Sequence, residues 1–216
     1  MKFENTRKLT SLVTEEGANS VSHGLGLIAS LAATPVLLLT AAKTGDGSAL
    51  IGASVFAGSM VSLYLASTLY HAMPENRGKH IFRLLDHSAI FLLIAGTYTP
   101  FTLGVLRGPW GWALLGSIWT LALAGLLLKA YPATRHSKLI IILYVVMGWL
   151  AIVAARPILT QVHLNGVVLI IAGGLAYTSG LVFYGMHRLR FNHFIWHLFV
   201  MVGTACHFFA VLWYSK

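Results

Sequence analysis

Long apolar segments dominate the chain, and short polar segments separate them. Seven continuous apolar runs can be distinguished, each near the roughly 20 residues that a helix needs to cross a bilayer. They cover residues 20–42, 49–72, 84–106, 110–128, 139–155, 164–184 and 194–214. None alternates apolar and polar residues in the way of a membrane β-barrel strand. The pattern predicts an all-α membrane protein, a seven-transmembrane helix bundle whose sequence neighbours run antiparallel.

Composition narrows the class in the same direction. Of the 216 residues, 57% are hydrophobic and only 10% are charged, whereas a soluble domain carries about 25% charged residues. This excludes a soluble globular enzyme, and the abundance of apolar residues excludes a disordered chain. Seven spans consume about 140 residues, which leaves no room for a soluble domain. We therefore expect a cytoplasmic tail over residues 1–19 and one membrane domain over 20–216.

The net charge of +9 is distributed unevenly between the two sides of the predicted bundle. Eleven lysines and arginines lie in the first, third, fifth and seventh polar segments, and four lie in the others. The positive-inside rule then places the N-terminus in the cytoplasm and the C-terminus outside. The basic excess is thus a topology signal with contact to anionic lipid heads. No nucleic-acid partner is expected, because no reading motif occurs.

Ionisable and polar residues inside spans are costly and usually functional, and here most of them fall at the predicted cytoplasmic ends. Within each group they recur at helical spacing, so that they share one face. They are Glu16, Asn19 and His23 at the first run, Ser67 and His71 in the second, Asp86 in the third, and His193 and His197 in the seventh. The histidines played no part in the charge count, so their common depth is an independent signal.

Three imidazoles and a water form a common catalytic zinc shell. His193 and His197, four residues apart on one helix, can bind one metal ion, and His71 would complete the set. Such a pair is by itself a weak indication, because single histidines often only pack inside a bundle. The third histidine and a carboxylate at the same depth favour a zinc site.

The HExxH protease motif is absent because residue 194 is phenylalanine, so a general base must come from another helix. Asp86 is the best-placed carboxylate, and Ser67 is expected to hydrogen-bond the water or orient Asp86. These two are the predicted catalytic residues. Glu16, Asn19 and His23 are predicted to form a supporting network around the metal ligands, although Glu16 and Asn19 could simply cap and polarise a helix start.

These residues also resemble the motifs of a known family. The pattern Glu-x2-Asn-x3-His, then Ser-x3-His with a following aspartate, then His-x3-His resembles the progestin and adipoQ receptor family. The runs SLYLASTLYH, LLDHSAIFLLIAGTYTPF and FNHFIWHLFV are similar to its bacterial hemolysin III-like branch. The resemblance covers nearly the whole chain.

The resemblance implies a seven-helix bundle with a cytoplasmic N-terminus in the bacterial inner membrane. It implies zinc held by His71, His193 and His197, with Asp86 and Ser67 near the zinc-bound water. It also implies relatives in signalling and in ceramide hydrolysis, and a cellular role in membrane homeostasis.

Three functions remain open on this basis, and membrane lipids are the expected partners in the first two. The first is a zinc-dependent intramembrane hydrolase of lipid amide or ester bonds. The second is a lipid-state sensor in which zinc is structural. The third, ranked last, is a transporter, pore or hemolysin, because seven spans do not divide into equal repeats and the polar cluster lies toward one side. The identity of the fourth metal ligand separates the first two.

Overall fold

The computed structural model describes residues 14–135 and 137–216, and all regular secondary structure within them is helical. Seven segments of this part are long and apolar enough to span a membrane, which confirms the predicted fold class. Six are single helices: α2 Glu15–Ala42, α3 Gly47–Ala72, α4 Arg77–Leu103, α5 Pro109–Ala130, α8 Leu164–Gly185 and α9 Asn192–Tyr214. The remaining span joins α6 Lys138–Gly148, the 3₁₀ segment η2 Leu150–Ala154 and α7 Ala155–Gln161.

Polar residues before the apolar runs start several of these helices. A side-chain oxygen that accepts a hydrogen bond from a backbone N–H of the first turn satisfies a group that the helix leaves unpaired. Thr14 does so for α2, Asp46 for α3, Asn76 for α4 and Ser137 for α6. Helix α5 instead begins with Pro109, whose fixed φ suits the first helical position.

Helix boundaries differ from the predicted runs most clearly at three places. Helix α2 begins at Glu15 instead of residue 20, with acidic residues in its first turn, where the helix dipole favours them. Helix α4 begins at Arg77 instead of residue 84 because the Asn76 side chain caps it. The fifth span continues to Gln161 instead of ending at 155, since Pro157 falls in the first turn of α7, where its missing N–H costs little.

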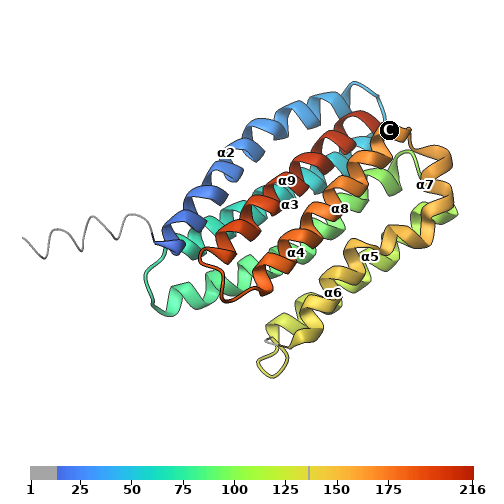
Figure 1. Ribbon diagram of the computed structural model, residues 1–216. Helices are drawn as coiled ribbons and strands as arrows, with labels where there is room; N and C mark the ends of the chain where they lie inside the picture. The colour runs from blue at the N-terminus through green and yellow to red at the C-terminus, as the bar shows by residue number, and fades with distance from the viewer. Residues whose placement is uncertain (1–13, 136) are drawn as a thin grey trace, which may run out of the picture.

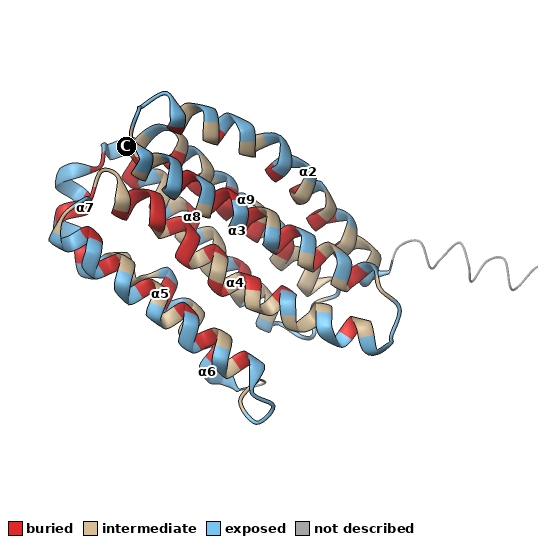
Figure 2. Cartoon of the chain, turned by 180° about the vertical axis from the view of Figure 1, so that it is seen from behind, coloured by how far each residue is buried: buried red, intermediate tan, exposed pale blue. Residues whose placement is uncertain are grey.

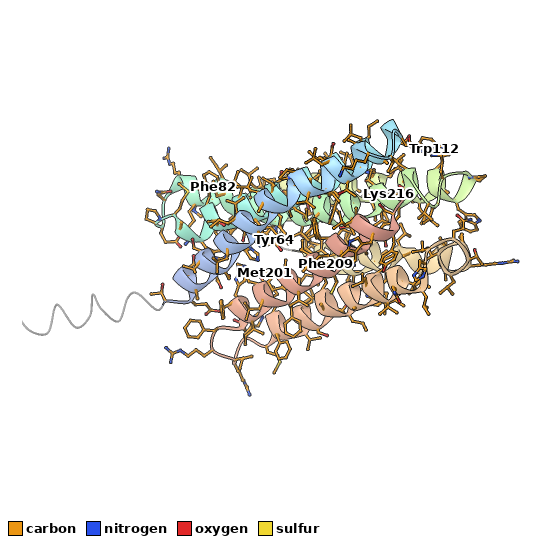
Figure 3. The ribbon with its side chains drawn as sticks, turned by 90° about the horizontal axis from the view of Figure 1, so that it is seen from above. Tyr64, Phe82, Trp112, Met201, Phe209 and Lys216 are labelled. Carbon is orange, nitrogen blue, oxygen red and sulfur yellow. The ribbon has the colours of Figure 1, made fainter. Side chains whose placement is uncertain are left out.

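The predicted orientation of the bundle stays a prediction. Three of the basic residues that support it, Lys2, Arg7 and Lys8, lie outside the described residues, as does most of the predicted tail. The two ends of the bundle are nevertheless distinct: Figure 3 shows Phe82 at one end, Trp112 and Lys216 at the other, and Tyr64 between the helices in the interior.

The helices form a closed group with one looser side. Helix α2 packs on α3, α3 on α4, and α8 on α9, and α2 also meets α9, so the first and last spans are neighbours (Figure 1). Helix α5 packs on α4, and α6 contacts α4 and α5, but α6 makes no comparable contact with α8. Buried faces point toward the centre of the bundle (Figure 2), while large apolar side chains such as Ile28 and Val153 cover the outside, as a lipid-facing surface requires.

One close contact fixes α5 against α4. Phe91 of α4 is fully buried in a core with Ile118 and Met147. Gly125 of α5 lies directly over its ring, so that an added Cβ would fall 2.2 Å from Phe91 Cε1. Gly116 of the same helix has no neighbour within 4 Å of such a Cβ. The absence of a side chain at 125 therefore lets these two helices approach.

Candidate metal centre

Three histidines from two helices meet at one end of the bundle. His71 lies in the last turn of α3, and His193 and His197 lie one turn apart in α9. One ring nitrogen of each lies within 4.8 Å of the others, so the group could hold a metal ion. The rings meet edge to face, with centroids 4.7–5.0 Å apart. The structure thus brings together the three predicted metal ligands.

Hydrogen bonds orient two of these rings. His71 Nδ1 lies 3.2 Å from Glu16 Oε2, and His197 Nδ1 lies 3.3 Å from the Asn19 carbonyl oxygen. Ser22 Oγ lies 3.2 Å from the same nitrogen and donates its own hydrogen to the Asn19 carbonyl oxygen at 2.9 Å. With the hydroxyl hydrogen used in this way, both oxygens accept from Nδ1 of His197, and its Nε2 keeps a free lone pair. His71 Nε2 is buried and has no hydrogen-bond partner in the described residues. A metal-binding histidine commonly has this arrangement, with its second nitrogen fixed by a carboxylate or carbonyl.

Glu16 belongs to a larger polar network in the structure. Its Oε2 also accepts a hydrogen bond from Lys79 Nζ at 2.9 Å, and Lys79 pairs with Glu75 at 3.0 Å. Glu16 thereby joins the starts of α2 and α4 to His71 of α3. Lys79 lies between the predicted runs 49–72 and 84–106 and is not among the predicted site residues. Two features of the sequence could have identified Lys79. Asn76 is a residue type that caps helices, and Glu75 and Lys79 on either side of it are four residues apart, the spacing of a helical ion pair.

A second acidic residue supports α9 from α2. Helix α9 follows Phe191, a residue with φ of 61° whose side chain provides no cap. Glu15 Oε1 instead accepts a hydrogen bond from the backbone N–H of His193 at 3.0 Å. A carboxylate at a helix N-terminus is stabilising, and this one holds the helix that carries two of the three histidines. No pattern in the sequence around Glu15 or around His193 predicts this hydrogen bond, because the two residues are far apart in the chain.

His23 and Asn19 contact the site through ring stacking and a backbone oxygen. The His23 ring stacks on His197 with centroids 3.5 Å apart and planes at 9°, and it meets Tyr64 edge-on at 5.1 Å. Neither nitrogen of His23 has a partner in the part of the chain that the structure describes. Asn19 acts through its backbone oxygen rather than its amide. Both residues therefore contact His197 and set the plane of its ring.

The two predicted catalytic residues are both buried. Asp86 lines the same cavity as His193 and His197, and the Ser67 hydroxyl has no hydrogen-bond partner among the described residues. Asp86 of α4 is 8% exposed, and Ser67 of α3 is fully buried. The Asp86 carboxylate lies outside the group of three nitrogens that could share a metal ion. Its place in the wall of the same cavity as His193 and His197 is compatible with a proton-transfer role. The catalytic roles stay predictions.

A cavity of about 290 Å³ begins at the histidines and extends into the bundle. His23, Asp86, His193 and His197 line one end of it. Trp149, Tyr177, Thr178 and His207 line the other, and mainly apolar side chains of α4, α6 and α8 lie between. The cavity borders the side where α6 and α8 make little contact. It is long and apolar enough for a hydrocarbon chain that ends near the polar cluster.

Known proteins of similar sequence share nearly the full length of the chain. A family profile described as haemolysin-III related matches residues 12–208. "Hemolysin-3" of Bacillus cereus is 46% identical, over 98% of this chain and 96% of the relative. "Hemolysin-3 homolog" of Bacillus subtilis (strain 168) is 42% identical, over 94% of this chain and 95% of the relative. The human "Monocyte to macrophage differentiation factor" is 24% identical, over 91% and 83% respectively.

Proposed function

Since this multi-pass membrane chain belongs to the haemolysin-III-related family, we propose that it is a zinc-dependent hydrolase of lipid amide or ester bonds that serves membrane homeostasis in the bacterial plasma membrane. One observation carries the proposal: three histidine nitrogens converge at the end of an apolar cavity, beside a buried carboxylate. Catalytic zinc sites typically use three protein ligands and keep the fourth position open.

The donor set fits zinc among the common metals. Neutral imidazole nitrogens suit zinc, whereas magnesium and calcium prefer oxygen ligands. His71 and His197 each direct Nδ1 to an oxygen acceptor, which leaves Nε2 for a metal ion. When bound, zinc would polarise a carbonyl and lower the pKa of a bound water to about 7.

The residues of the chain would supply proton transfer, orientation and a dry site. Asp86 accepts a proton from the attacking water and then donates it to the leaving nitrogen or oxygen, while the carbonyl C–N or C–O bond breaks. The products are a fatty acid and an amine or alcohol. Ser67 would position Asp86 or the water through its hydroxyl, and the apolar cavity would hold the acyl chain away from bulk water.

Asp86→Asn tests this mechanism. We expect fatty-acid release to fall by at least about 100-fold, since loss of a general base typically costs two to four orders of magnitude. Zinc content should stay at one ion per chain, because the three histidines remain. The measurement is fatty acid released from a bacterial lipid extract by purified protein with stoichiometric zinc. Asp46→Asn, in the loop between α2 and α3, is the control and should keep full activity. No release by the unsubstituted zinc-loaded protein would sink the proposal.

A sensor with structural zinc is the second candidate. The observation that favours it is that the three histidines join α3 to α9, while Glu15 and Glu16 tie both helices to α2. A metal there would cross-link the bundle, and a change in lipid state could alter the packing around it. X-ray absorption spectroscopy of the zinc-loaded protein distinguishes the two. A fourth protein ligand supports the sensor, and a water ligand supports the hydrolase.

We also propose that the metal centre lies on the cytoplasmic side, as the basic residues indicate. In a Cys206→Ser background, Thr44→Cys and Arg188→Cys place single thiols in loops at opposite ends of the bundle. We expect a membrane-impermeant thiol reagent to label Thr44→Cys in intact cells and Arg188→Cys only after permeabilisation. The reverse pattern would place the N-terminus outside.

A further inference from the structure

Two basic residues line the cavity near the candidate metal centre. Lys129 ends α5, and Arg135 lies in the loop that follows. Lys129 is only 8% exposed, and its Nζ donates a hydrogen bond to the Arg135 backbone oxygen at 3.0 Å. Lys138, at the start of α6, is instead exposed and does not line the cavity. Lys129 and Arg135 are therefore part of the cavity wall, in addition to their contribution to the predicted topology.

The positive charge at this wall is not balanced. The charges near Lys129 are those of Arg83, Arg135 and Asp86. The three cations Lys129, Arg83 and Arg135 make no ion pair within 4.0 Å in residues 14–135 and 137–216. Arg135 Nε is buried and has no hydrogen-bond partner there either. A buried cation is costly unless an anion or several hydrogen bonds compensate it. Lys129 is buried and Arg135 half-buried, with Asp86 as the one nearby anion, and this excess of positive charge favours an anionic ligand.

We propose that the cavity binds a glycerophospholipid, with its phosphate at Lys129 and Arg135 and an acyl chain along α4, α6 and α8. Lysine and arginine bind phosphate oxygens through charge-assisted hydrogen bonds. From Tyr184 at the polar end to Gly174 at the deep end, the lining of α8 covers about 15 Å at 1.5 Å per residue. That length accommodates a hydrocarbon chain, whereas a free phosphate ion would fill only the polar end.

This inference rests on the proposed function, because it names the substrate class of the same cavity. It selects an acyl ester over an amide as the bond to be cleaved. Hydrolysis would break the acyl C–O bond, with the hydroxyl of water going to the fatty acid and its hydrogen to the glycerol oxygen. The products are a fatty acid and a lysophospholipid, and no further reactant is needed.

Lipid binding to the full-length, zinc-loaded protein in neutral detergent tests the proposal. Native mass spectrometry would compare phosphatidylglycerol, a diacylglycerol with the same acyl chains, and inorganic phosphate. We expect phosphatidylglycerol to bind at least about tenfold more tightly than diacylglycerol, as expected for charge-assisted hydrogen bonds. Lys129→Gln and Arg135→Gln should each remove about tenfold of that preference, and Lys138→Gln should leave it unchanged.

Equal affinity for the two lipids on the unsubstituted protein would overturn the proposal, and this comparison does not depend on whether any variant folds. Displacement of phosphatidylglycerol by equimolar inorganic phosphate would also overturn it, since the wall would then be a free-anion site. Selective binding without fatty-acid release contradicts only the hydrolase. Fatty-acid release without tighter binding of phosphatidylglycerol than of diacylglycerol contradicts only the assignment of a phospholipid as the ligand.

Discussion

His197→Ala is expected to abolish the zinc binding that we propose for this protein. His197 is 1% exposed, its Nδ1 is fixed by the Asn19 carbonyl, and its ring is stacked on His23. Loss of a residue that only orients a ligand costs about 10- to 100-fold in metal affinity, so loss of the ligand itself should cost more than about 100-fold. We expect zinc to fall from one ion per chain to nearly none after dialysis against a zinc buffer.

His187→Ala is the matched control for this experiment. His187 is an exposed residue between α8 and α9, and its removal should leave one zinc ion per chain. Elemental analysis of both variants, after gel filtration has confirmed that each is folded, gives the ratio directly. Full zinc occupancy in folded His197→Ala would show that the ion binds elsewhere.

Gly125→Leu should prevent stable folding of the bundle. An added Cβ at this position would lie 2.2 Å from Phe91 Cε1, and Phe91 is fully buried, so a shift of its ring would displace other core side chains. Overpacking a core typically costs 1–3 kcal/mol and sometimes more, and a contact this short with a leucine should exceed about 3 kcal/mol. We expect little folded protein after membrane extraction, measured as the monodisperse fraction and as the midpoint of thermal unfolding.

Two other variants make this result specific to the contact. Gly116→Leu lies in the same helix, where a Cβ meets nothing within 4 Å, so its yield and unfolding midpoint should stay near those of the unsubstituted protein. Gly125→Ala combined with Phe91→Leu should recover part of the stability lost in Gly125→Ala alone. Equal yields for Gly125→Leu and Gly116→Leu would contradict the role assigned to Gly125.

The seven spans and the grouping of polar residues could be predicted because both are periodic features of single segments. Twenty apolar residues specify a span wherever they occur, and helical spacing identifies residues on a shared face. Because consecutive spans alternate in direction, residues at the ends of distant spans could be assigned to one depth. His71, His193 and His197 accordingly meet as expected.

Several features could not be predicted because they depend on contacts between segments or on local caps. Lys79 lies in a polar segment whose composition is typical of a loop. The Asn76 side chain caps a helix there, and Lys79 is part of that helix. The hydrogen bond that the His193 backbone N–H donates to Glu15 joins residues 178 positions apart. The stack of His23 on His197 depends on how α2 settles against α9. Periodicity places such residues at a depth but does not give their partners.

Because α2 packs against α9, the order of synthesis also limits when the site can form. The first span enters the membrane before the last one is synthesised, yet Glu15 and Asn19 each accept a hydrogen bond from the last span. Two of the three histidines are on that span as well. The early helices therefore lie in the membrane without a complete histidine group, and a chain that stops before α9 could not form the proposed metal centre.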